Sequence, residues 1–116
     1  MGNYPKALAS HEKALAIKQN SLPPNHPSLA MSYNNIGLVY YSMGDYPEAL
    51  QSHKKALGIR KQSLPPTHPE LATSYNNIGI VYRSMNNYPK ALASYEKALT
   101  IYQQSLPPNH PSLATS

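Results

Sequence analysis

Apolar and small residues between Pro27 and Gly44 recur at steps of three and four residues, which is the spacing of one buried helix stripe. These residues are Leu29, Tyr33, Ile36, Gly37 and Tyr40. Pro27 suits the first turn of a helix, where a missing N–H costs nothing. Gly44 suits the left-handed position at which a helix ends. The pattern therefore predicts a helix that begins just after His26 and ends at Gly44.

A second helix is predicted to follow directly. Asp45 can cap it, and Glu48, three residues later, completes a capping-box pattern. Its apolar positions are Ala49, Leu50, Ala56, Leu57 and Ile59. The alanines, together with Gly37, let two antiparallel helices approach closely. The run Leu64-Pro65-Pro66 must end the second helix, because proline lacks the N–H and clashes with the preceding turn.

This pair of patterns repeats along the chain with a period of 42 residues. The string Ser-Leu-Pro-Pro begins at Ser21, Ser63 and Ser105. A fixed period of this size is the signature of a solenoid, in which each unit buries its apolar face against its neighbours. The expected organisation is one array, with a second-type helix in residues 1–20, full units in 21–62 and 63–104, and the start of a further unit in 105–116.

At this point the residues resemble a known family. Tyr33, Ile36, Gly37, Tyr40, Tyr46, Ala49 and Ala56 fall in the order and spacing of the tetratricopeptide repeat signature. The 42-residue unit and strings such as His68-Pro69-Glu70-Leu71-Ala72 and Tyr75-Asn76-Asn77-Ile78 are similar to the repeats of kinesin light chains. The resemblance covers essentially the whole chain. It implies an all-α fold, a right-handed α-solenoid of stacked antiparallel helix hairpins.

The same resemblance implies a peptide-binding groove on the concave side, lined mostly by the first helix of each unit. Side-chain amides there can grip a peptide backbone, and a basic residue of the second helix can grip an acidic side chain. The implied groove residues are Lys18, Asn34, Asn35, Leu38, Tyr41, Arg60, Asn76, Asn77, Ile80 and Arg83. The expected function is therefore a protein-protein interaction module that holds a short peptide.

The composition indicates which partners and activities to expect of this chain. Ten Lys or Arg residues against five Asp or Glu give a net charge of +5, which favours an acidic protein or peptide partner. The chain has no cysteine, and its histidines and carboxylates are scattered one or two to a unit, so we expect no metal, no cofactor and no enzymatic activity. No apolar run approaches membrane-spanning length, so we expect a cytoplasmic protein without a membrane partner.

Three other functions compete with peptide binding. Nucleic acid could use the lysines and tyrosines, but most lysines fall on the second helices and alternate with glutamates there, so we expect no such partner. The chain could instead be a structural array that associates head to tail through uncapped end helices, without a dedicated peptide ligand. It could also be the sensor segment of a larger signalling protein.

Overall fold

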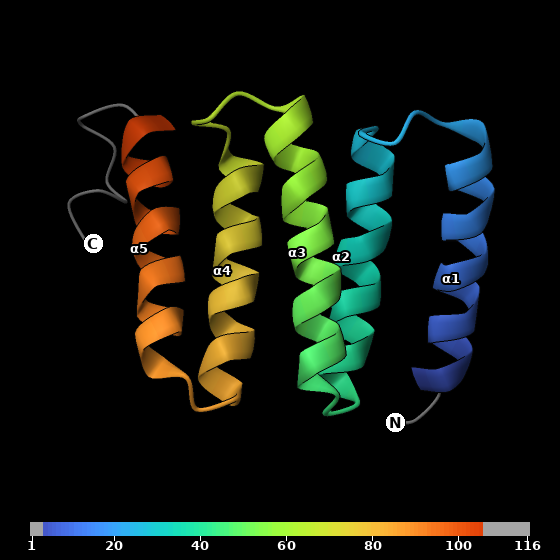
Figure 1. Cartoon of the computed structure of the whole chain (residues 1–116), viewed down its shortest axis with the longest axis horizontal. Coiled ribbons are helices and arrows are strands. Elements are labelled where there is room, and N and C mark those ends of the chain that lie inside the picture. Colours follow the sequence, from blue (N-terminus) through green and yellow to red (C-terminus); the bar gives the residue numbers. More distant parts are fainter. Residues whose placement is uncertain (1–3, 106–116) are drawn as a thin grey trace.

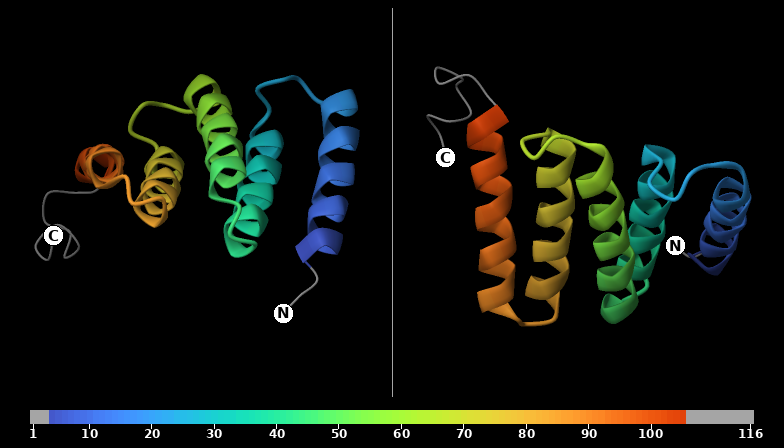
Figure 2. Two further views of the ribbon diagram at one scale, coloured as in Figure 1. Left: turned by 60° about the horizontal axis from the view of Figure 1, so that its bottom comes forward. Right: turned by 45° about the horizontal axis from the view of Figure 1, so that its top comes forward.

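The computed structural model describes residues 4–105, and this part of the chain is entirely helical. Its helices are α1 (Tyr4–Ser21), α2 (Pro27–Ser42), α3 (Tyr46–Ser63), α4 (Pro69–Ser84) and α5 (Tyr88–Ser105). Each helix lies beside the next one in chain order and runs antiparallel to it (Figure 1). The two turned views show the same sequential arrangement (Figure 2). The predicted all-α solenoid of helix hairpins is confirmed. The further unit expected in 105–116 lies, apart from Ser105, outside the described residues.

Packing is tightest within the hairpins α2–α3 and α4–α5 and looser at the joints α1–α2 and α3–α4. The hairpin turns need a left-handed residue, which is Gly44 (φ +80°) in the first and Asn86 (φ +66°) in the second. The helix end predicted at Gly44 is therefore confirmed. Asn86 stands in the same column, and asparagine is among the few residues with a Cβ that enter this region readily.

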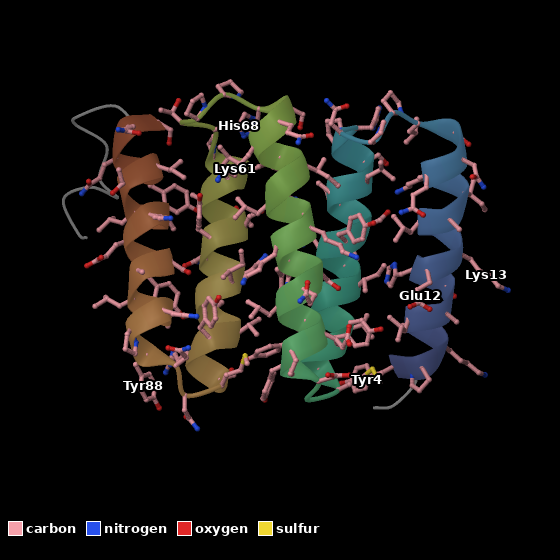
Figure 3. The ribbon with its side chains drawn as sticks, viewed as in Figure 1. Tyr4, Glu12, Lys13, Lys61, His68 and Tyr88 are labelled. Carbon is pink, nitrogen blue, oxygen red and sulfur yellow. The ribbon has the colours of Figure 1, made fainter. Side chains whose placement is uncertain are left out.

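Histidine caps the first helix of both full units, α2 and α4. The Nδ1 atom of His26 accepts a hydrogen bond of 3.1 Å from the backbone N–H of Ser28, and that of His68 accepts one of 3.1 Å from Glu70. His68 lies at the junction of the α3–α4 loop with α4 (Figure 3). Pro69 follows in the first turn, so the helix starts predicted from the prolines are confirmed. The capping role of the histidines was not predicted.

The capping box predicted for α3 is wrong. Asp45 occupies the N-cap position, but its side chain makes no capping hydrogen bond, and its backbone (φ −92°, ψ 75°) differs from the extended backbone of His68 (φ −68°, ψ 134°). Pro47 stands in the first turn of α3, where its missing N–H costs nothing. The proline, rather than the aspartate, therefore marks the start of this helix.

Small residues form the centre of each hairpin, as predicted. Ala49 and Ala56 of α3 are fully buried, and Ala91 and Ala98 of α5 are 3% exposed. Opposite them, a Cβ added to Gly37 would lie 2.8 Å from Nε2 of His53, and one added to Gly79 would lie 2.8 Å from a ring carbon of Tyr95. Each hairpin is thus closed by a ring that packs directly on a glycine.

The core contains more polar groups than the apolar pattern predicted. Buried serines, His53 and Arg60 occupy positions between the helices, whereas the predicted stripe residues Tyr33 and Tyr40 are only half-buried. The His53 side chain is 2% exposed. Because desolvation disfavours the imidazolium and the positive charge of Arg60 opposes it further, the pKa of His53 is lowered from 6.5 to about 4.

Adding a methyl group at Gly37 tests the close contact within the hairpin. We expect Gly37→Ala to lower the free energy of unfolding by about 1–3 kcal/mol, because the buried His53 ring has little room to move. Gly58 is the matched control. Nothing lies within 4 Å of its Cβ position, so Gly58→Ala should raise stability by about 0.5–1 kcal/mol. Urea denaturation measures both changes, and an equal response of the two variants would contradict the assigned contact.

Acid should weaken the fold through His53. The unfolded chain takes up a proton at this residue near pH 6.5, whereas the folded chain does so only near pH 4. Stability is therefore fully present above pH 6.5 and is lost as the pH falls towards 4, by up to about 3 kcal/mol. His53→Tyr, which copies the column of Tyr95, should remove this share of the pH dependence. Denaturation at stepped pH values compares the two proteins, and parallel pH profiles would be evidence against this role.

Candidate functional site

The first helices of the two units, α2 and α4, meet along a seam of polar contacts. Nδ2 of Asn77 donates a hydrogen bond of 2.8 Å to Oδ1 of Asn34, and the hydroxyl groups of Tyr41 and Ser84 lie 2.6 Å apart. Each contact joins residues that are 43 positions apart in sequence. We call the surface that carries this seam the A face. The structure thus brings together Asn34, Asn77 and Tyr41, which were all predicted as site residues.

The amide pair keeps capacity for another molecule. A side-chain amide carries two N–H donors and a carbonyl with two lone pairs, and the bond between Asn34 and Asn77 uses one donor and one acceptor site. Both side chains are only partly buried. Of the other two predicted amides, Asn35 on α2 is half-buried like this pair, whereas Asn76 on α4 is exposed.

Apolar and basic side chains adjoin the seam. The exposed fractions are 50% for Met31, 47% for Leu38 and 38% for Ile80, which are large values for hydrophobic residues. Arg83 is exposed near the C-terminal end of α4. Tyr41 is half-buried, and its ring centroid lies 5.2 Å from that of Tyr46 with the ring planes at 50°. Leu38, Ile80 and Arg83 are therefore accessible to a ligand, whereas Tyr41 is engaged in the fold.

The remaining two predicted residues, Lys18 and Arg60, lie at the joints between units. Nζ of Lys18 donates to Oγ of Ser32 over 3.0 Å, which links α1 to α2. Nη1 of Arg60 donates to Oγ of Ser74 over 2.7 Å, which links α3 to α4. Both serines are buried, with 4% and 1% exposure. Lys18 and Arg60 occupy the same position of the repeat, and each donates a hydrogen bond to a buried serine of the helix that follows.

Arg60 is the more deeply placed of the two. Its exposed fraction is 4%, and its Nε lies 3.6 Å from a carboxylate oxygen of the half-exposed Glu70. Desolvation lowers the pKa of the guanidinium, and the charge of Glu70 raises it. The guanidinium also lies 3.5 Å from the backbone carbonyl of Glu70. In this conformation the Arg60 side chain is directed at its own chain.

The joint role of Lys18 and Arg60 was missed at the sequence level, although a signal for it exists. A serine follows each of these residues at the same distance of 14 positions. Serine is unremarkable in an exposed helix, but a serine in the buried stripe of a helix needs a hydrogen-bond partner. Ser32 and Ser74 therefore called for a donor from the preceding helix.

Within residues 4–105, no three side chains of the His, Cys, Asp or Glu types gather where they could hold a metal ion. In the same range no helix combines the length and hydrophobicity needed to cross a membrane.

Comparison with known proteins shows which family these repeats match. Family models described as "Tetratricopeptide repeat" match residues 1–62 and residues 71–112. The comparison with curated protein sequences gave no match. Among solved structures, BtubC (BKLC) from P. vanneervenii is similar to this chain with 28% sequence identity and a TM-score of 0.79, over 92% of this chain and 44% of that one.

Two other structures show the same arrangement of helices. A protein of Podosopora anserina, described as a kinesin light chain with nearly identical TPR-like repeats, has 24% identity and a TM-score of 0.82 over 96% of this chain and 53% of its own. The apo form of RapI has 30% identity and a TM-score of 0.76 over 88% and 35% of the two chains. The chain thus spans about half of these proteins or less.

Removing the Arg60 side chain tests its role at the joint. Arg60→Ala leaves the hydroxyl of Ser74 without its donor, so we expect the free energy of unfolding to fall by about 1–3 kcal/mol. Arg60→Lys should lose less, because Lys18 makes the corresponding bond one unit earlier. A double-mutant cycle with Ser74→Ala isolates the pair, and a coupling energy near zero would refute the contact.

Proposed function

This chain belongs to the tetratricopeptide repeat family, whose repeats form protein-interaction modules, and we propose that it holds a peptide segment of a partner protein on its A face. The observation that carries the proposal is the bridge between Asn34 and Asn77. It holds two amides of neighbouring units at a fixed separation and leaves each of them with hydrogen-bonding capacity. An extended peptide has one N–H and one carbonyl at nearly every residue, so a pair of fixed amides suits its backbone.

Apolar contacts on both sides of the bridge support the same proposal. Met31 and Leu38 from α2 and Ile80 from α4 are exposed hydrophobic residues that a peptide would cover. Covering such residues is favourable by about 25 cal/mol per Å² of apolar surface removed from water. In this arrangement the amides orient the peptide backbone, and the aliphatic side chains supply most of the affinity.

An acidic residue in the ligand fits the charge of the site. Arg83 is exposed on α4, one residue before the Tyr41 partner Ser84. A guanidinium can hold a carboxylate through two parallel hydrogen bonds. We therefore assign the recognition of a carboxylate to Arg83. Lys18 and Arg60 contribute indirectly in this proposal, because their bonds to buried serines fix the spacing of the helices that carry the A face.

Titration with an acidic, tryptophan-containing peptide tests the proposal. Asn77→Ala removes the bridge and a backbone-binding group, so the affinity should fall by about 1 kcal/mol or more. Arg83→Ala should cause a loss of similar size that shrinks as salt is added, because the lost contact is exposed and charged. Lys13→Ala on α1 is the control and should bind like the unmodified protein. Isothermal titration calorimetry measures each affinity.

Light scattering on the same samples separates the alternatives. A monomer whose peptide affinity responds to Asn77 and Arg83 supports the A-face site. Unchanged affinity in both variants would rule out the A-face site. A mass that rises with concentration, in a protein that binds no peptide, would favour the self-associating array. Exposed apolar residues on the terminal helices, such as Ile17 of α1 and Leu92 of α5, would be the contacts in that case.

A further inference from the structure

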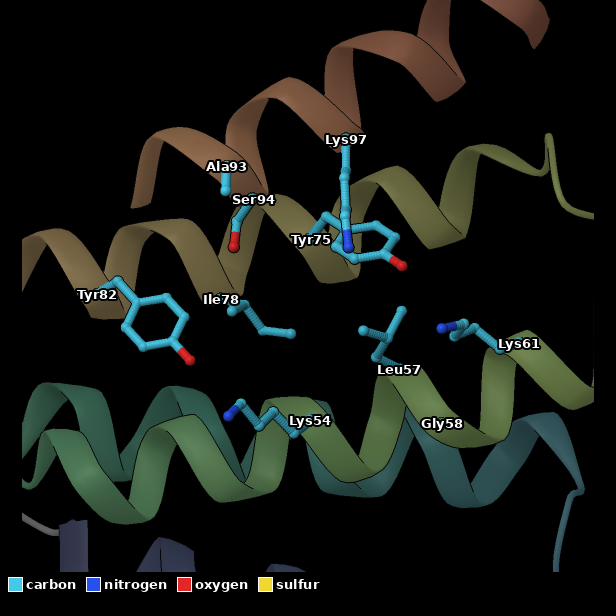
Figure 4. Close-up of a pocket in the computed structure, with 10 residues that line it drawn as sticks. All are labelled: Lys54, Leu57, Gly58, Lys61, Tyr75, Ile78, Tyr82, Ala93, Ser94 and Lys97. Atoms are coloured by element: carbon cyan, nitrogen blue, oxygen red, sulfur yellow. The ribbon is translucent and has the colours of Figure 1, made fainter. Parts of the chain in front are cut away.

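A groove of about 400 Å³ lies on the side of α4 opposite to the A face, between α3 and α5 (Figure 4). Its apolar lining comes from Leu57 of α3 and from Tyr75, Ile78 and Tyr82 of α4. These α4 positions fall on the other side of the helix from Asn77 at 3.6 residues per turn. We call this feature the B groove. It shares no lining residue with the A-face site.

Lysines occupy both sides of the B groove. Lys54 and Lys61 extend from α3 and Lys97 extends from α5, and no carboxylate belongs to the lining. The ammonium of Lys97 lies 5.4 Å from the ring centre of Tyr75, and that of Lys54 lies 5.7 Å from that of Tyr82. Within residues 4–105 the one ion pair joins Arg60 and Glu70, so none of the three groove lysines is paired with an acid, and Lys54 and Lys97 rest against tyrosine rings.

The preceding unit supplies an internal comparison. The columns of Tyr75, Tyr82 and Lys97 hold Tyr33, Tyr40 and Lys55 there, so the ring and one lysine are kept. On α1, one period of 42 residues before α3, Glu12 stands in the column of Lys54 and Gln19 in the column of Lys61. Three positive charges in the B groove thus correspond to one positive and one negative charge one unit earlier. Because both units have the same fold, the fold does not require the three lysines.

We propose that the B groove is a second docking site, distinct from the A face, and that it takes a short acidic segment of a partner protein. Carboxylates of the segment would lie near Lys54, Lys61 and Lys97, and an apolar side chain between them would cover the half-buried Leu57 and Tyr75. Charge complementarity selects an acidic partner. The apolar lining selects a peptide over a nucleic acid, because lysines already cover the tyrosine rings on which bases would stack.

Small residues keep the walls of this groove open. Gly58 of α3 and Ala93 of α5 belong to the lining, and a Cβ at Gly58 would meet no atom within 4 Å. A larger side chain at Gly58 can therefore enter the groove without disturbing the hairpin. The site can thus be altered in two independent ways, by its charge and by its volume.

The first test changes the charge. The probe is a peptide of about twelve residues with a central leucine flanked by glutamates, titrated into the isotope-labelled protein. We expect backbone amide shifts to cluster at Leu57, Gly58 and Ser94, and the Lys54→Glu/Lys61→Gln variant to bind about fivefold to tenfold more weakly. The control, Lys6→Gln/Lys13→Glu, makes the same charge change on exposed positions of α1 and should bind normally.

The second test changes the volume. Gly58→Leu fills the groove without altering the charge and should weaken the probe to a similar degree. Asn77→Ala should leave these shifts intact, so failure of the A-face proposal and failure of this one can be told apart. The proposal is overturned if the shifts map to Leu38 and Asn77, or if neither groove variant weakens the probe. It is also overturned if a single-stranded oligonucleotide or a second copy of the chain occupies the groove in place of the peptide.

Discussion

The contact between a glycine of one helix and a ring of the next fixes the separation of the two helices in each hairpin. Gly37 meets His53 and Gly79 meets Tyr95, each so closely that a single added carbon atom would collide. Buried alanines complete the interface and admit no wider spacing without a void. Every other feature follows from this spacing, because the A face and the B groove lie on opposite sides of the same closely packed layer of helices.

The sequence predicted the architecture because the repeat makes each helix visible more than once. The proline at the first turn and the left-handed residue after α2 set helix bounds that the structure confirms. The capping box at Asp45 failed because the backbone of Asp45 is not extended as it is at His26 and His68, a local detail that the pattern of residue types does not reveal. The buried polar residues were harder to predict than the helix ends. His53 and Arg60 look like surface residues until their buried partners are known.

The candidate sites, like the fold, were predicted only in part from the sequence. The hydrogen bond between Asn34 and Asn77 joins two units across 43 positions. Both residues were predicted as site residues from the family resemblance, and the structure has them on the same face. The role of Arg60 was indicated only indirectly, by the buried serine that follows it 14 positions later, and the depth of its side chain is visible only in the structure. The B groove was missed because the lysines of the second helices were considered only as possible contacts for nucleic acid. Only the structure shows that residues of α3 and α5 converge above the same three residues of α4.

The two joints between units are not equally stiff. At the α3–α4 joint, the planar guanidinium of the buried Arg60 holds a buried serine hydroxyl and lies beside a carboxylate. At the α1–α2 joint, the flexible Lys18 holds the hydroxyl of Ser32, and Gln19 donates a hydrogen bond of 3.0 Å to the hydroxyl of Tyr33 at the exposed surface. If the molecule were stretched along its long axis, the strain would gather where the polar contacts between helices are most exposed to water. The array would therefore yield first between α1 and α2, and the four helices from α2 to α5, with the A-face seam and the B groove, would move as one block under tension.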